Sequence, residues 1–133
     1  MLVRIYYEDT DAGGVVYHSN YIKYFERSRT EYFRNRNFFV AELAGNGFVF
    51  PVVRLEIDFK APAVHDDLLI VTTSPLRVGR SSITFSQKIE RQNDNKVIVT
   101  GIVTLACITP GFKATRIPLE MRQMLEKEME QLN

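Results

Sequence analysis

The chain has 133 residues, 45% of them hydrophobic and 25% charged, which predicts one domain over residues 1–133 with one compact core. A formal net charge of +1 argues against a protein built chiefly to hold nucleic acid, and the single Cys107 excludes an intramolecular disulfide framework and fits a buried core thiol. The N-terminus lacks the pattern of a signal peptide, and no apolar run approaches the roughly 20 residues of a transmembrane helix, so we expect a cytoplasmic protein without a transmembrane segment.

The first half of the chain predicts a short strand, a polar loop and a long helix. Alternating residues from Leu2 to Tyr7 indicate the strand. From Tyr21 the apolar spacing becomes helical for about four turns, with Asn20 as the expected N-cap. One face of this helix carries Tyr21, Tyr24, Phe25, Ser28 and Tyr32.

The second half predicts four longer strands and a terminal helix. A hydrophobic cluster at 38–43 is followed by a turn at 45–47, and the strands follow at 53–60, 68–78, 81–91 and 96–108. Pro118 opens the helix, one side of which carries Met121, Leu125, Met129 and Leu132. This order predicts an α+β fold, an antiparallel sheet wrapped around one central helix. Because residues 96–108 are apolar or small on both faces, we also expect a homo-oligomer.

The loop between the first strand and the helix has the composition of an active site. It holds the carboxylates Glu8, Asp9 and Asp11, two glycines, a histidine and several tyrosines. Crowded carboxylates raise one another's pKa, glycines allow close approach of a ligand, and a helix start offers unpaired N–H groups. Glu8 and Asp9 are expected to be structural, and any of the three carboxylates could simply cap the helix or a turn.

The segment Tyr7-Glu8-Asp9-Thr10-Asp11-Ala12-Gly13-Gly14-Val15-Val16-Tyr17-His18, with Asn20-Tyr21 and Phe25-Glu26-Arg27 after it, closely resembles the YbgC-type acyl-CoA thioesterases of the hotdog-fold superfamily. It is also similar to the wider 4-hydroxybenzoyl-CoA thioesterase group. The resemblance implies a hotdog fold, catalytic positions at Tyr7, Asp11 and His18, an acyl-CoA substrate, no metal, and no cofactor beyond the coenzyme A of the substrate. It further implies a dimer or a dimer of dimers, hence a homotetramer, with active sites at subunit interfaces.

The residues independently support thioester hydrolysis. A carboxylate such as Asp11 can act as nucleophile or as general base for water, while His18 and backbone amides polarise the carbonyl. Gly13, Gly14 and Val15 would line the substrate, although the two glycines alone could be ordinary turn residues.

Four basic side chains flank the hairpin between the second and third long strands. Arg77 and Arg80, with Lys88 and Arg91, are candidates to bind the phosphates of coenzyme A, although each could equally belong to a solvated strand face. The segment His65-Asp66-Asp67 has metal-ligand residue types but fits a polar turn better.

Two other functions remain compatible with the same fold. One is an acyl-thioester dehydratase or isomerase. The other is a module that binds acyl-CoA or acyl carrier protein without turnover. For hydrolysis, the acyl group expected is short- to medium-chain or aromatic.

Overall fold

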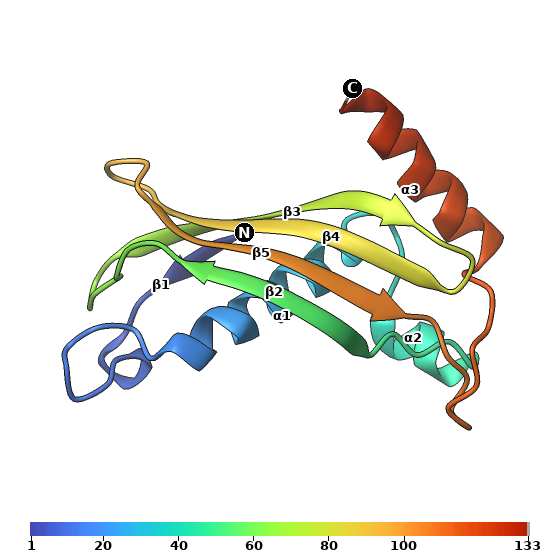
Figure 1. Cartoon of the computed structure of the whole chain (residues 1–133), viewed down its shortest axis with the longest axis horizontal. Coiled ribbons are helices and arrows are strands. Elements are labelled where there is room, and N and C mark those ends of the chain that lie inside the picture. Colours follow the sequence, from blue (N-terminus) through green and yellow to red (C-terminus); the bar gives the residue numbers. More distant parts are fainter. Residues whose placement is uncertain (133) are drawn as a thin grey trace.

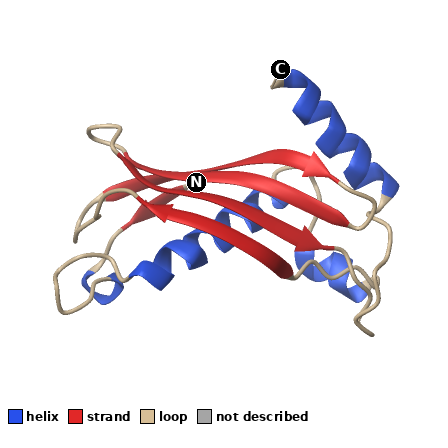
Figure 2. Ribbon diagram, in the orientation of Figure 1, coloured by secondary structure: helices blue, strands red, loops and turns tan. Residues whose placement is uncertain are grey.

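The computed structural model describes residues 1–132, which form a curved antiparallel sheet around one long helix (Figures 1 and 2). Five strands lie in the order β1-β3-β4-β5-β2. The elements are β1 (Leu2–Arg4), the 3₁₀ helix η1 (Tyr7–Asp9), α1 (His18–Arg34), α2 (Val40–Gly45), β2 (Val52–Phe59), β3 (Leu68–Val78), β4 (Ser82–Arg91), β5 (Val97–Ala106) and α3 (Leu119–Gln131). The expected α+β architecture is confirmed.

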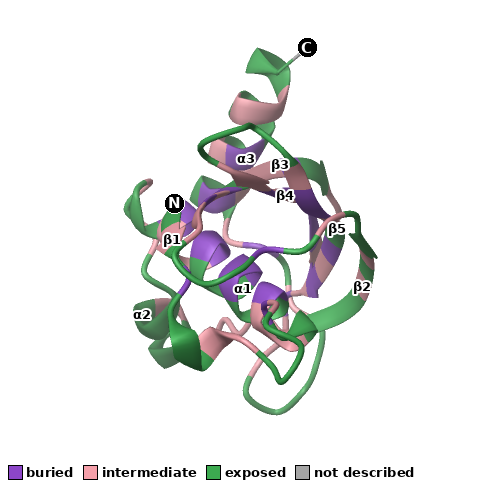
Figure 3. Cartoon of the chain, turned by 90° about the vertical axis from the view of Figure 1, so that its left-hand side faces the viewer, coloured by how far each residue is buried: buried purple, intermediate pink, exposed green. Residues whose placement is uncertain are grey.

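Helix α1 fills the inner face of the sheet because its sequence carries a continuous apolar stripe. Its buried residues recur every three or four positions, as a helix with one covered face requires. They are Tyr21, Tyr24, Phe25, Ser28, Arg29, Tyr32 and Phe33. Figure 3 shows the buried part of α1 enclosed by the sheet.

Helix α1 packs tightly against the sheet at Gly101 of β5. A Cβ atom at this position would lie 2.7 Å from Cε2 of Phe25, a ring that is fully buried. The strand therefore needs glycine here, because any side chain would push against the helix.

Helix α3 packs against β3 and closes the end of the core beyond α1. Met121 and Leu125 are buried, as the apolar side of the predicted helix required, but Leu132 at its end is 62% exposed. The hydroxyl of Tyr32 on α1 donates to Glu128 of α3 at 2.5 Å, and the guanidinium of Arg36 also binds that carboxylate.

Several local predictions differ from the structure. The first strand ends at Arg4, because residues 7–9 form η1. Helix α1 begins at His18 after Tyr17, and the side chain of Asn20 donates to the Asp9 carbonyl instead of capping the helix. The cluster before the turn at 45–47 is a short helix, α2.

Strand β2 differs most from its predicted environment. Its alternating pattern predicted a buried face, and Leu55 and Ile57 on that face do pack against the core, but Val53 is 61% and Phe59 50% exposed. The reason is its place at the edge of the sheet, where it pairs only with β5 in this chain. Among residues 1–132, no helix combines the length and apolarity needed to cross a membrane.

Candidate active site

Asp9 anchors the loop that joins η1 to α1. Its Oδ2 accepts the backbone N–H of Tyr6 at 2.8 Å, and its carbonyl accepts the N–H of Tyr17 and the Nδ2 of Asn20, each at 2.9 Å. These bonds tie both ends of the loop together. Asp9 is therefore structural, as expected, while Glu8 is exposed beside it.

Asp11 lies at the start of a tight turn that the two glycines make possible. Its N–H donates to Val15 O at 2.9 Å, its carbonyl accepts from Gly14 at 3.0 Å, and its Oδ1 accepts from Gly13 at 2.8 Å. Gly14 has a φ of +81°, a conformation that favours glycine. A Cβ at Gly13 would lie 3.2 Å from Asp11 Oδ1, so a side chain there would crowd the carboxylate.

The far side of the turn is held against residues 63 and 64. Val16 donates to Ala63 O at 2.9 Å, and Val15 forms an isolated bridge with Val64. The hydroxyl of Tyr21 accepts the N–H of Ala63 at 3.2 Å. The turn is thus rigidly supported while Asp11, Gly13 and Gly14 stay exposed.

His18 is the first residue of α1 and lies directly after this loop. Its ring is 4.6 Å from that of Tyr17 and packs edge-on to Phe59 of β2 at 6.1 Å, centroid to centroid. Among residues 1–132 no side chain caps this end of α1, and the Asn20 N–H donates to Tyr17 O at 2.9 Å, which leaves the N–H groups of His18 and Ser19 for a ligand. The histidine and the helix start therefore lie beside the Asp11 turn.

Tyr7 occupies a different environment from the one its strand-like sequence suggested. It lies in η1, is 79% exposed, and its ring is 6.1 Å from that of His65. Among residues 1–132, no hydrogen bond joins the side chains of Tyr7, Asp11 and His18 to one another.

The four basic residues predicted as one phosphate-binding cluster do not form one cluster. In the β3–β4 ladder Arg77 pairs with Thr84, whereas Arg91 lies seven residues further along β4, about 24 Å away at the usual strand rise. Arg91 instead binds Asp67 at 3.5 Å, and Lys88 binds Glu90 at 3.2 Å.

Arg80 belongs to a different basic group that the sequence did not reveal. Together with Arg116 and Arg122 it lines a surface hollow of about 590 Å³ beside the start of α3. Arg122 also donates to the Gly79 carbonyl at 2.5 Å, which holds the β3–β4 turn in place. These arginines come from three separate segments, so only the folded chain brings them together.

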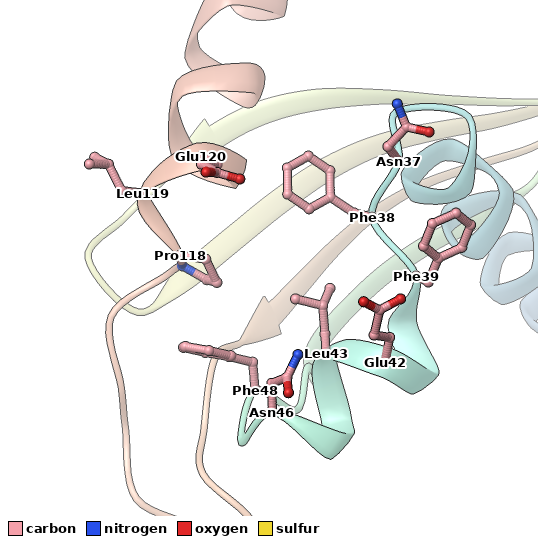
Figure 4. A pocket seen from close by; sticks show the side chains of 10 residues that line it. All are labelled: Asn37, Phe38, Phe39, Glu42, Leu43, Asn46, Phe48, Pro118, Leu119 and Glu120. Carbon is pink, nitrogen blue, oxygen red and sulfur yellow. The ribbon is translucent and has the colours of Figure 1, made fainter.

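Another hollow lies between α2 and the start of α3, at the opposite end of the sheet from the Asp11 turn (Figures 1 and 4). Its volume is about 490 Å³, and Phe38, Leu43 and Phe48 form its apolar wall while Glu42 and Glu120 are polar. It holds none of the predicted catalytic groups.

Comparison with known proteins identifies the family. Residues 13–98 match the family model described as thioesterase superfamily. The acyl-CoA thioesterase YbgC of Haemophilus influenzae is 42% identical over 122 residues, which cover 90% of this chain and 88% of that protein. The chain belongs to the thioesterase superfamily, as a YbgC-type member. It is accordingly a thioester hydrolase that acts on acyl-CoA.

Solved structures agree with the hotdog fold of this thioesterase. A probable thioesterase from Bartonella henselae has a TM-score of 0.83 at 34% identity and covers 89% of this chain and 97% of its own. The DHNA-CoA thioesterase from Staphylococcus aureus has a TM-score of 0.89 at 25% identity, and the match covers 100% of this chain and 91% of that one.

Proposed function

We propose that the thioesterase hydrolyses its acyl-CoA at the turn formed by Asp11, Gly13 and Gly14, with the start of α1 beside it. The observation that carries this proposal is the Asp11 carboxylate, presented on a turn fixed by three hydrogen bonds and followed directly by His18 and the uncapped helix end. The products are the free acid and coenzyme A.

In this proposal Asp11 either takes a proton from water, which then attacks the thioester carbonyl, or attacks that carbonyl itself. The carbonyl oxygen becomes an oxyanion, which the N–H groups at the start of α1 and the His18 ring stabilise. When the oxyanion collapses, the C–S bond breaks and the thiolate leaves. In the general-base route the thiolate takes up the proton that Asp11 removed from water, and the free acid is released. In the nucleophilic route the acyl group stays on Asp11 as a mixed anhydride, which water then hydrolyses to the free acid, while the thiolate takes a proton from the solvent. Tyr7 would orient the substrate from the exposed side, with Val15 lining the turn.

The decisive experiment is Asp11→Asn. The amide oxygen of asparagine can still accept the Gly13 N–H, so the turn should persist, but the residue can neither attack nor accept a proton. We expect a loss on the order of a hundred- to ten-thousandfold in kcat. Glu8→Gln neutralises an exposed carboxylate in the same segment and should leave kcat near the wild-type value. Near wild-type turnover of Asp11→Asn would remove this residue from the mechanism.

For the acyl group we propose a short- to medium-chain or aromatic acid. An exposed turn with half-buried apolar residues nearby is compatible with either, and the relative from Staphylococcus aureus is named for an aromatic acyl-CoA. A panel of acyl-CoA esters with release of free thiol as the signal would identify the preferred group. Acyl carrier protein remains a candidate alternative carrier for the same thioester, and a matched acyl carrier protein panel tests it.

We further propose that Arg77 and Arg80 bind the phosphates of coenzyme A, and that they do so for a substrate whose thioester lies at the Asp11 turn of another subunit. Leu68 of β3 pairs with Arg4 next to the loop, whereas Arg77 lies nine residues further along β3, about 30 Å away. One chain thus holds the two groups near opposite ends of its sheet.

Mixing inactive chains tests this division of the site. A chain with Asp11→Asn and a chain with Arg77→Gln and Arg80→Gln should each have low activity, by loss of kcat and by raised KM respectively. Unfolding and reassembling them together should restore part of the activity at low substrate, because hybrid oligomers contain intact sites. No recovery in a mixture proven to contain hybrids would refute the shared site.

A further inference from the structure

Arg29 is a charged residue in the buried stripe of α1, 8% exposed. Its Nη1 donates to Gln87 Oε1 at 3.0 Å, and among residues 1–132 no carboxylate lies within ion-pair distance of its guanidinium. Burial lowers the pKa of Arg29, and the charge of nearby Glu26 opposes that shift. Arginine nevertheless keeps its charge in proteins.

Among residues 1–132, hydrogen bonding uses only one of the donors of Arg29. The side-chain amide Nε2 of Gln87 donates to Phe25 O at 3.0 Å and to Thr73 Oγ1 at 2.8 Å, so both of its N–H donors are used. A guanidinium has five N–H donors, and a buried charge is ordinarily paired or fully hydrogen-bonded. The other two guanidinium nitrogens have no hydrogen-bond partner among residues 1–132 and are not fully shielded from solvent, so an acceptor from outside the chain can reach them.

Arg29 lines a small, partly enclosed hollow of about 70 Å³. Its apolar walls are Phe33, Val40, Leu43, Phe50 and Leu105, from α1, α2, the segment before β2, and β5. A water molecule takes up about 30 Å³ in the liquid, so the hollow has room for a group of only a few heavy atoms. An apolar recess with one charged donor suits the polar end of an otherwise apolar group.

The hollow lies on the same side of α1 as His18. The positions His18, Ile22, Glu26, Arg29 and Phe33 follow one another at intervals of three or four residues, which places them along one stripe. At one end His18 packs against Phe59, and at the other Phe33 is 6.2 Å from Phe50, centroid to centroid. His18 and Arg29 are eleven residues apart, about 16 Å along the helix.

We propose that Arg29 is a specificity-determining residue that binds an uncharged hydrogen-bond acceptor, a hydroxyl or keto oxygen, on the distal part of the acyl group. This inference rests on the proposed function, which puts the thioester carbonyl at His18. A neutral acceptor is favoured over a second carboxylate because Glu26 lines the same hollow and would repel an anion.

The test compares matched pairs of acyl-CoA esters that differ only in a terminal methyl or a terminal hydroxymethyl group, over a series of chain lengths. Wild-type enzyme should prefer the hydroxylated member at the length that reaches the hollow. Arg29→Met should reduce this ratio of kcat/KM values roughly ten- to hundredfold, the range typical of one hydrogen bond to a charged group. Arg27→Met is the matched control, since Arg27 lies on the exposed side of α1 above the Tyr24 ring, and it should keep the ratio.

The outcomes separate this inference from the proposed function. If wild-type enzyme hydrolyses both series with equal kcat/KM at every length, the role of Arg29 is refuted and the Asp11 site stands. If Asp11→Asn retains full activity, the proposed function fails whatever Arg29 does. Preference for a terminal carboxylate over a hydroxyl would overturn the assignment of a neutral acceptor. The wild-type comparison decides the question even if Arg29→Met fails to fold.

Discussion

Replacing Gly101 with alanine tests how tightly α1 is seated on the sheet. The new Cβ would lie 2.7 Å from Phe25 Cε2 and 3.2 Å from Cζ, whereas carbon atoms prefer about 3.5–4.0 Å. The ring is fully buried and would have to shift by about 1 Å into packed neighbours. Such overpacking costs about 1–3 kcal/mol, while alanine in a strand regains about 0.5–1 kcal/mol over glycine. We expect Gly101→Ala to lower the free energy of unfolding by about 1–2 kcal/mol.

Equilibrium unfolding in urea at one fixed protein concentration measures this change, since association would make stability depend on concentration. Gly45→Ala is the matched control: its Cβ meets no atom within 4 Å and it lies in α2, so the same substitution should stabilise by up to about 1 kcal/mol. Adding Phe25→Leu to Gly101→Ala should cost less than Phe25→Leu costs in the wild type. Equal or higher stability of Gly101→Ala would refute the proposed contact.

Three further predictions concern charge, backbone and the sheet edge. Burial raises the pKa of Glu128, but hydrogen bonds from Arg36 and Tyr32 and the charge of Arg36 outweigh it and lower that pKa. The contribution of Glu128 to stability is therefore present above the unfolded-state pKa, near 4.3, and is lost as the pH falls through the lower folded-state pKa. Glu128→Gln should therefore lower stability at pH 7 and weaken the dependence of stability on acid below about pH 4. An unchanged acid dependence in urea titrations would contradict this. Gly14→Ala should destabilise by about 1 kcal/mol because φ is +81°, and thermal unfolding that matches wild type would show that the turn relaxes. Val53→Lys, on the exposed edge strand, should shift light-scattering mass toward the monomer, and an unchanged mass would exclude this edge from the interface.

The elements with strong periodicity could be predicted from the sequence. The paired spacing of Tyr21, Tyr24 and Phe25 indicated the buried face of α1, and the strands β3 and β4 end within a residue of their predicted bounds. Cys107 is buried, as its apolar surroundings suggested. In each case the local pattern and the tertiary environment agree, because the apolar side of the element is the side that the rest of the chain covers.

The predictions failed where the burial or contacts of a residue depend on segments far away in the sequence. Alternation in β2 is compatible with a covered face, but only the sheet order shows that this strand is at the edge. Asn20 has a good capping side chain, yet its amide donates a hydrogen bond to the carbonyl of Asp9, and the helix starts at His18, three residues earlier than predicted. The arginines that line one hollow come from residues 80, 116 and 122, and no local spacing joins them.

The candidate catalytic residues could be proposed from the sequence because they lie in one continuous loop, whereas the residues that surround this loop come from distant segments. Asp11 and His18 are exposed in the isolated chain, yet stabilising an oxyanion by fixed dipoles is most effective where water is excluded. The edge strand β2 ends beside the site: its last residue, Phe59, packs against His18 and is half exposed. Pairing this edge with a second chain would satisfy the backbone groups of β2 and cover His18 with the same contact. We therefore expect that the assembly which completes the sheet also completes the site, so that a variant which dissociates should lose kcat along with its partner.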